Sequence, residues 1–306
     1  MKRRRIVSLL PSATEMVCAL GCRDQLVGRS HECDFPTDVS GVPVCTESKI
    51  LPDSNSRAIN EQVRNLTAAS LSIYRVNEKR LLELKPDIIL TQTQCDVCAV
   101  SEKEVARAVE KWLGARPRVV SFSPVRLGDV WDDLQRLAAI LECKQRGHEV
   151  LKALKTRCVN VIEKSCLSGR KPTAACIEWL DPLMAAGNWV PDLVEMAGGK
   201  NLFGERGQHS DWMTWEQVRE ANPDFLILMP CGFDIARTVE ELGLLRQKSG
   251  WAKLKAVKNN QVVVVDASAY FNRPGPRLVD SLETLGEIIH PEFFQFGHKG
   301  KAWVRV

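Results

Sequence analysis

The chain has 306 residues, enough for two α/β lobes and too many for one small core. Hydrophobic residues make up 44% and charged residues 26%, which is an ordinary globular balance. The formal net charge is only +4 and no dense basic stripe is present, so a strongly basic nucleic-acid binder is excluded.

Short β-branched runs alternate with longer helical patterns in the first third of the chain, which predicts parallel strands connected by helices. Gly21 stands where a glycine in the left-handed conformation would end a helix, and Pro86 prevents a helix from continuing into the next strand. The expected strands are 5–9, 25–29, 87–91 and 118–121, and the expected helices are 14–20, 78–84 and 102–113.

The next segment, residues 127–166, contains no proline and no strand pattern. Leu134, Leu137 and Ile140 recur in it at helical spacing, which predicts one long helix or two abutting helices. A second α/β pattern begins after a turn at 168–172. Its expected strands are 173–178, 225–229 and 261–265, and its expected helices are 190–197, 214–221, 239–248 and 276–289.

The order of these elements predicts an α/β protein of two lobes with parallel sheets, joined by a long interdomain helix. The expected boundaries are 1–126 for the N-terminal lobe, 127–168 for the linking helix and 169–306 for the C-terminal lobe. No run of about 18 apolar residues occurs, so the sequence predicts no transmembrane helix.

Polar, thiol and aromatic side chains come directly after the predicted strands of both lobes. In open parallel sheets, ligands bind beyond the carboxyl ends of the strands, so we expect these positions to form one cleft shared by the lobes. The large flat aromatic side chains of the second lobe suit a large flat ligand. The candidate ligand-binding residues are Ser12, His31, Glu32, Gln94, Glu178, Trp179, Phe233, Tyr270, Phe271 and Arg273.

A candidate metal site combines Cys95 and Cys98, which form a Cys-x-x-Cys pair, with His31 and Cys33 from another strand of the same lobe. These ligand types suit tetrahedral zinc, and they could equally bind iron, copper or the cobalt of a corrinoid. His31 is also a candidate axial ligand of cobalt. A redox-active thiol pair and simple cleft-lining thiols without metal remain open as alternatives.

Catalytic signatures are weak in this sequence. It contains no P-loop and no G-x-S-x-G elbow. Glu32, Glu178 and Asp181 could act as acid and base, but no bond for them to break is identifiable. The catalytic alternative is a thiol enzyme with Cys95 or Cys98 as nucleophile and His31 as base. The sequence therefore favours a binding protein over an enzyme.

Several phrases along nearly the whole chain carry a family resemblance. They are 8–15, 26–30, 34–36, 84–89, 197–203, 215–218 and 270–277. In this order they resemble the cobalamin-binding branch of the substrate-binding proteins of ABC importers, the class III plan with a helical backbone between two lobes. The resemblance is more specific for the fold than for the ligand, because siderophore and haem binders share the same plan.

The resemblance implies that cobalamin, or a related corrinoid or metal chelate, is held between the lobes. Zinc or iron at the thiol site is not part of this resemblance and follows from the ligand types alone. It also implies one surface acid in each lobe that docks on an ABC permease in the membrane. Glu216 matches the acid of the second lobe. The first-lobe position carries Lys79 beside Glu78, which departs from the family pattern.

Three features predict a cytoplasmic, unsecreted relative that binds, stores or hands over its ligand. The apolar stretch at residues 6–10 is short for a secretory signal. The 11 cysteines form no regular framework, which suggests reduced thiols. Lys79 stands where the family pattern has an acid, which is a further difference from proteins that dock on a permease. No nucleic-acid partner and no membrane insertion are expected.

Overall fold

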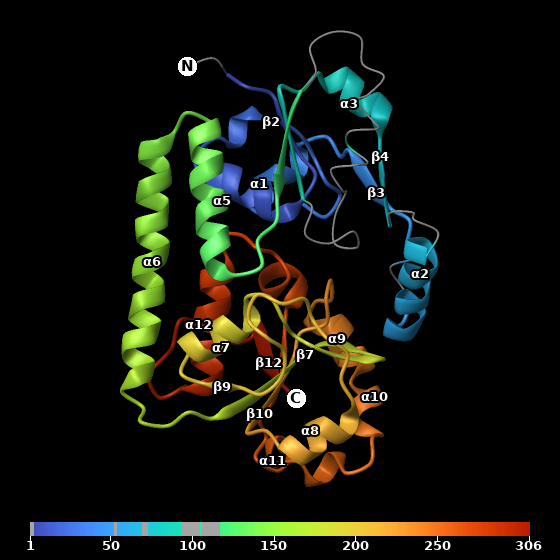
Figure 1. Cartoon of the computed structure of the whole chain (residues 1–306), viewed down its shortest axis with the longest axis vertical. Helices are drawn as coiled ribbons and strands as arrows, with labels where there is room; N and C mark the ends of the chain where they lie inside the picture. Colours follow the sequence, from blue (N-terminus) through green and yellow to red (C-terminus); the bar gives the residue numbers. More distant parts are fainter. Residues whose placement is uncertain (1–2, 52–53, 69–72, 93–104, 106–116) are drawn as a thin grey trace. The chain divides into compact units, whose positions relative to one another are not determined.

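The computed structural model describes residues 3–51, 54–68, 73–92, 105 and 117–306 (Figure 1). The chain divides into two compact units. The first comprises Met1–Ser54, Ala58–Pro124 and Gly128–Lys152, and the second comprises Asn55–Arg57, Val125–Leu127 and Ala153–Val306. The helix expected at 102–113 falls almost entirely outside the described residues.

The first unit is built on a sheet of four parallel strands in the order β2-β1-β5-β6. The strands are β1 (Ile6–Ser8), β2 (Leu26–Arg29), β5 (Ile88–Gln92) and β6 (Arg118–Phe122). All five residues of β5 are buried, as expected for a central strand of a parallel sheet that is covered on both faces. All four strands were predicted from the sequence to within about two residues at each end.

Helices and a short antiparallel strand pair lie outside this sheet. Pro11 opens the first helix, where its missing N–H costs nothing, and Gly21 follows the helix with φ +75°. Two antiparallel strands that the sequence pattern does not predict pair with each other. The elements are α1 (Pro11–Ala19), α2 (Ser56–Ala68), α3 (Glu78–Leu84), β3 (Thr46–Ser48) and β4 (Tyr74–Val76).

The long helical segment is two helices rather than one. Helix α5 (Leu127–Ile140) ends before Glu142, whose φ of +60° is incompatible with a continuous helix. Helix α6 (Lys144–Cys166) then runs for 23 residues. The chain passes from the first unit into the second within α6, between Lys152 and Ala153.

The second unit contains a mixed sheet in the order β12-β11-β10-β7-β8, with β9 also paired to β7. The parallel strands β7, β10 and β11 were predicted, whereas the antiparallel strands β8 and β12 were not. The strands are β7 (Thr173–Leu180), β8 (Leu183–Ala185), β9 (Lys200–Asn201), β10 (Phe225–Leu228), β11 (Val262–Val265) and β12 (Trp303–Arg305).

The helices of the second unit pack around these strands. The helix expected at 239–248 is two short helices and begins earlier, because the Asp234 side chain accepts a hydrogen bond from the Arg237 N–H and caps the first of them. The helices are α7 (Val190–Met196), α8 (Trp215–Ala221), α9 (Ile235–Glu241), α10 (Gly243–Arg246), α11 (Lys255–Lys258) and α12 (Leu278–Ile289).

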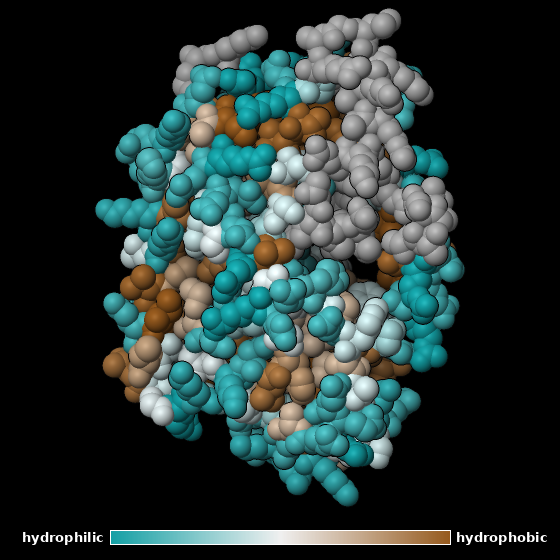
Figure 2. Space-filling model, in the orientation of Figure 1, coloured by the Kyte–Doolittle hydropathy of each residue, from teal (hydrophilic) through white to brown (hydrophobic). Residues whose placement is uncertain are grey.

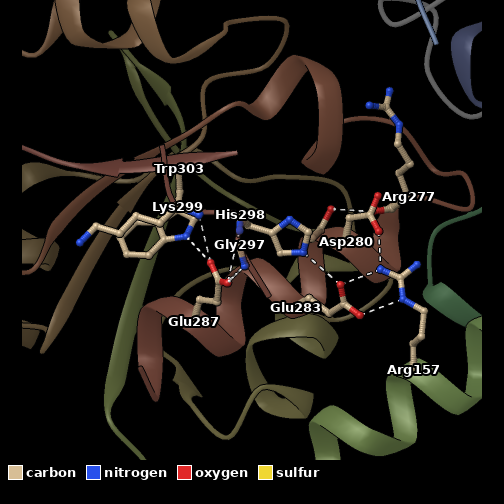
Figure 3. A network of polar contacts seen from close by, with 10 residues as sticks. Arg157, Arg277, Asp280, Glu283, Glu287, Gly297, His298, Lys299 and Trp303 are labelled. Carbon is tan, nitrogen blue, oxygen red and sulfur yellow. Dashed lines mark hydrogen bonds and ion pairs between the residues drawn. The ribbon is translucent and has the colours of Figure 1, made fainter. Parts of the chain in front are cut away.

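A polar network fastens the C-terminal segment to α12 (Figure 3). The Glu287 carboxylate accepts hydrogen bonds from the backbone N–H groups of Gly297 and Lys299, at 2.6 and 3.2 Å, and from the Trp303 indole at 2.9 Å. Next to it, Glu283 receives the guanidinium of Arg157 from α6, with Nε 2.8 Å from Oε1. Burial alone would raise the pKa of Glu283, but hydrogen bonds from His298 and Arg157 bring it below the usual range.

No helix among the described residues is both long and apolar enough to cross a bilayer. Hydrophilic residues cover most of the molecular face that Figure 2 shows, and hydrophobic residues appear there as separate patches.

Candidate ligand-binding site

In the first unit, the predicted ligand residues lie where β1 and β2 end. Ser12 is in the first turn of α1 and is 4% exposed. The segment after β2 begins with the buried Ser30 and continues with His31 and Glu32, both partly exposed. Because β1 and β2 are parallel, their carboxyl ends lie at the same edge of the sheet, and the two segments that follow them begin there.

The His31 imidazole is held by Thr46 from β3. The Nδ1 atom of His31 lies 2.7 Å from the Thr46 hydroxyl oxygen, and the His31 backbone N–H donates to the same oxygen at 3.0 Å. The Thr46 hydroxyl in turn donates to Ser30 Oγ at 3.0 Å. Burial lowers the pKa of His31, and the neighbouring Glu32 acts in the opposite direction.

Tyr74 from β4 connects His31 with Glu32. Its ring centroid lies 5.5 Å from that of His31, and its hydroxyl donates to Glu32 Oε1 at 2.8 Å. An aromatic ring beside the imidazole and a fixed carboxylate next to it restrict the rotation of both predicted ligand residues.

The predicted metal set of His31, Cys33, Cys95 and Cys98 is described only in part. Cys33 is 2% exposed, and its Sγ lies 3.1 Å from the Thr14 hydroxyl, so this thiol is packed in the interior. Within the described ranges, no group of three or more His, Cys, Asp or Glu residues could hold a metal ion. Cys95, Cys98 and the neighbouring Gln94 lie outside those ranges, so their roles remain predictions.

In the second unit, an aromatic pair lies near the carboxyl end of β7. The ring centroids of Trp179 and Phe233 are 5.4 Å apart, and the Arg237 guanidinium lies 5.1 Å from the Phe233 centroid. Glu178, the preceding residue of β7, is half-buried, and its carbonyl accepts a hydrogen bond from the Cys231 N–H. Among the described residues, the buried Trp179 Nε1 has no hydrogen-bond partner.

The segment after β11 forms a short π-helix, Ala267–Phe271, which Asp266 caps by accepting from the Ala269 N–H at 2.8 Å. Tyr270 is half-buried, and the Arg277 guanidinium lies 5.2 Å from its ring centroid. π-Turns of this kind are frequent at functional sites because they change the direction in which side chains point.

Two predicted ligand residues of this segment are largely inside the protein. Phe271 is 0% exposed, and its carbonyl accepts the Trp189 indole N–H at 2.8 Å. Arg273 is 6% exposed. Phe271 anchors the segment that carries Tyr270 through this hydrogen bond, and direct ligand contact by Phe271 and Arg273 stays a prediction.

Sequence reasoning missed Thr46 and Tyr74, the residues that hold His31 and Glu32. Thr46 is 15 residues from His31, and Tyr74 is 42 residues from Glu32. No spacing pattern in the sequence connects them. The only local signal is the aromatic and β-branched character of Tyr74-Arg75-Val76, which is typical of a strand.

The comparisons with known proteins point to one family. A family model described as "Periplasmic binding protein" matches residues 6–269. The uncharacterized ABC transporter substrate-binding lipoprotein YvrC of Bacillus subtilis is 25% identical over 300 residues, covering 95% of this chain and 82% of that protein. The vitamin B12-binding protein of Vibrio cholerae is 24% identical over 285 residues, covering 92% and 87%.

Solved structures agree on the fold. The periplasmic vitamin B12 binding protein BtuF of Vibrio cholerae has a TM-score of 0.66 and 20% identity, covering 95% of this chain and 98% of that one. The periplasmic heme-binding protein RhuT of Roseiflexus sp. RS-1 has a TM-score of 0.69 and 19% identity, covering 94% and 98%. These similarities confirm the predicted two-lobed α/β fold of the class III plan.

The expected cytoplasmic location and unsecreted form are wrong, because the matched family is that of periplasmic binding proteins and the Bacillus subtilis relative is a lipoprotein. Residues 6–8 form β1 in the protein core, so the short apolar stretch there carries no information about secretion. Five of the nine described cysteines are buried core side chains, which is a better account of their number than a reducing compartment.

The same matches confirm the prediction of a binding protein rather than an enzyme. The matched family and the relatives named above are non-enzymatic transport components.

Proposed function

This chain belongs to the periplasmic binding protein family, whose members are the solute-binding components of ABC importers, and we propose that its solute is cobalamin or a related corrinoid or metal chelate. The observation that carries this proposal is the similarity to a vitamin B12-binding protein over 92% of the chain. The chemistry of these residues agrees with it. One unit offers an imidazole, and the other offers aromatic rings.

The aromatic residues of the second unit would supply apolar area for a flat macrocycle. Trp179 and Phe233 already contact each other, and Tyr270 is half-buried beside Arg277. Trp179 and Phe233 are 7% and 5% exposed, so Tyr270 would supply the larger part of the exposed ring area. Hydrogen bonds to the amide groups at the periphery of a corrinoid would come from Ser12, Glu32, Gln94, Glu178 and Arg273.

Delivery of the ligand to an ABC permease is the partner interaction that accompanies this function. We assign the contact in the second unit to Glu216, an exposed carboxylate in the first turn of α8. In the first unit, Glu78 and Lys79 are both exposed in the first turn of α3. Glu78 is therefore the acid available at that place for an arginine of the permease.

The test is a calorimetric titration of the purified chain with hydroxocobalamin, in parallel with hemin and a ferric siderophore. Saturable binding of one hydroxocobalamin per chain is the expected result. A folded, monodisperse sample that binds hemin or the siderophore but not hydroxocobalamin would rule out the corrinoid.

Two tryptophan variants, each first shown to be folded by thermal unfolding, test whether Trp179 contacts the ligand. Trp179→Ala should weaken hydroxocobalamin binding at least tenfold, because a fully desolvated aromatic contact is worth about 2 kcal/mol or more. Trp212 lies outside the candidate residues and is 58% exposed, so Trp212→Ala should leave binding within about twofold. Equal losses in both variants would count against ligand contact by Trp179.

A further inference from the structure

The hydrogen bonds around His31 favour one tautomer of its imidazole ring. The single hydroxyl proton of Thr46 is donated to Ser30 Oγ at 3.0 Å. Towards His31, the Thr46 oxygen can therefore only accept, and it lies 2.7 Å from Nδ1. This arrangement favours the proton on Nδ1, and in the neutral ring Nε2 then keeps its lone pair.

In this arrangement Nε2 is the ring nitrogen that is available to bind a metal. His31 is partly exposed, and among the described residues Nε2 makes no hydrogen bond. Its two neighbours in the sequence are used otherwise. Glu32 accepts the Tyr74 hydroxyl, and the Cys33 thiol is 2% exposed beside Thr14. His31 thus offers a partly exposed nitrogen donor of the kind that binds chelated transition metals.

From this geometry we propose that His31 Nε2 binds the metal of the chelate directly, and that Thr46 is the positioning residue that keeps Nε2 unprotonated and in place. The inference rests on the proposed function and specifies its metal-facing atom. Metal-bound histidines almost always donate their second ring N–H to a neighbouring acceptor, which fixes the tautomer and the ring orientation. Thr46 Oγ1 fills that role here.

The binding step is a ligand exchange without redox change. With aquacobalamin as the probe, Nε2 donates its lone pair to cobalt and the cobalt-bound water leaves. No proton has to move, because Nε2 is already unprotonated, and cobalt remains in the same oxidation state.

The imidazole is also restrained before any ligand arrives. The Tyr74 ring lies beside it with centroids 5.5 Å apart, and the His31 backbone N–H shares the Thr46 oxygen at 3.0 Å. Rotating the ring would break the Nδ1 contact. The donor atom is therefore preorganised, which reduces the entropy lost on binding.

The experiment compares the natural chain with Thr46→Ser, Thr46→Val and His31→Ala. Serine keeps the hydroxyl and is the matched control, whereas valine keeps the shape and removes the acceptor. Each protein is titrated with aquacobalamin by calorimetry, and the cobalt absorption bands are recorded at saturation. Nitrogen NMR of the ligand-free chain reports the His31 tautomer independently.

We expect an Nδ1–H tautomer in the ligand-free chain and a shift of the cobalt bands in the natural protein and in Thr46→Ser. The shift should disappear in His31→Ala. Thr46→Val should lose about 10–100-fold in affinity, the usual effect of removing a residue that orients a metal ligand. Thermal unfolding identifies any variant that fails to fold, and His31→Gln then replaces His31→Ala.

Two results would overturn the inference. If one aquacobalamin binds per chain and the cobalt bands do not change, His31 does not contact the metal, but the proposed corrinoid-binding function is still supported. An Nε2–H tautomer in the ligand-free chain would remove the role of Thr46. If no aquacobalamin binds at all, the proposed corrinoid function and the metal contact fail together.

Discussion

The two units use the carboxyl ends of their parallel strands in different ways. In the first unit this region is polar: His31 is hydrogen-bonded to Thr46, and Glu32 accepts a hydrogen bond from Tyr74. In the second unit it is aromatic and largely buried around Trp179 and Phe271. Equivalent positions in two similar sheets thus supply directional contacts in one case and apolar area in the other. The fold determines where a site lies, and the residues at that place determine its chemistry.

The largest expected effect is a loss of folding stability, and it tests whether the second region is buried. Phe271→Ala should lower the free energy of unfolding by about 3–5 kcal/mol, because the phenyl ring is 0% exposed and its removal leaves a cavity. Urea denaturation followed by tryptophan fluorescence measures this loss. A loss below about 1 kcal/mol would mean that Phe271 is not a core side chain and is available to a ligand.

Trp189 and Trp179 form a matched pair within the same unit, 6% and 7% exposed. The Trp189 indole donates to the Phe271 carbonyl, whereas the Trp179 indole has no partner among the described residues. Trp189→Phe should therefore cost about 1–3 kcal/mol more than Trp179→Phe, because it leaves a buried carbonyl unsatisfied. Denaturant unfolding of both variants tests the difference. Equal costs would contradict the assigned hydrogen bond.

In the first region, Tyr74→Phe removes the hydroxyl that donates to Glu32 at 2.8 Å. We expect a loss of about 0.5–1.5 kcal/mol in the free energy of unfolding, the usual value of one partly buried hydrogen bond. A double-mutant cycle with Glu32→Gln isolates the pair, and a coupling energy near zero would show that the two side chains act separately.

The smallest expected effect is an opposite response of the two regions to pH. Burial lowers the pKa of His31, so the unfolded chain binds its proton more readily. The stability that neutral His31 contributes is present above its unfolded pKa, about 6.5, and is lost as the pH falls below it. Burial instead raises the pKa of Asp266 above its usual 3.8, so stability falls as the pH rises through that value.

Two variants separate these responses. His31→Gln should flatten the stability profile between pH 5 and 7, at about the range where an unfolded histidine titrates. Asp266→Asn should gain stability over the natural chain at neutral pH and lose this advantage towards pH 3, about where an unfolded aspartate becomes protonated. Thermal unfolding across this range measures both. Profiles that stay unchanged would contradict the burial of the two groups.

The sequence predicted much of the fold, because buried parallel strands such as Ile88–Gln92 are β-branched runs with clear limits. It failed where structure depends on distant partners. Strand β12 forms only by pairing with β11, and Thr46 reaches His31 only through the β3 strand. The inward direction of Phe271 in its π-helix is a further feature that the sequence pattern did not indicate. Tertiary contacts of this kind leave no local pattern.

The network around Glu287 has a consequence for solubility. Strand β11 consists of Val262–Val265, four consecutive valines that are at most 2% exposed. Without β12 it would be an edge strand with unpaired backbone groups, the kind of segment that recruits other chains into aggregates. By binding Gly297, Lys299 and Trp303, Glu287 keeps β12 in position over that edge. One buried carboxylate thus acts as a safeguard against aggregation.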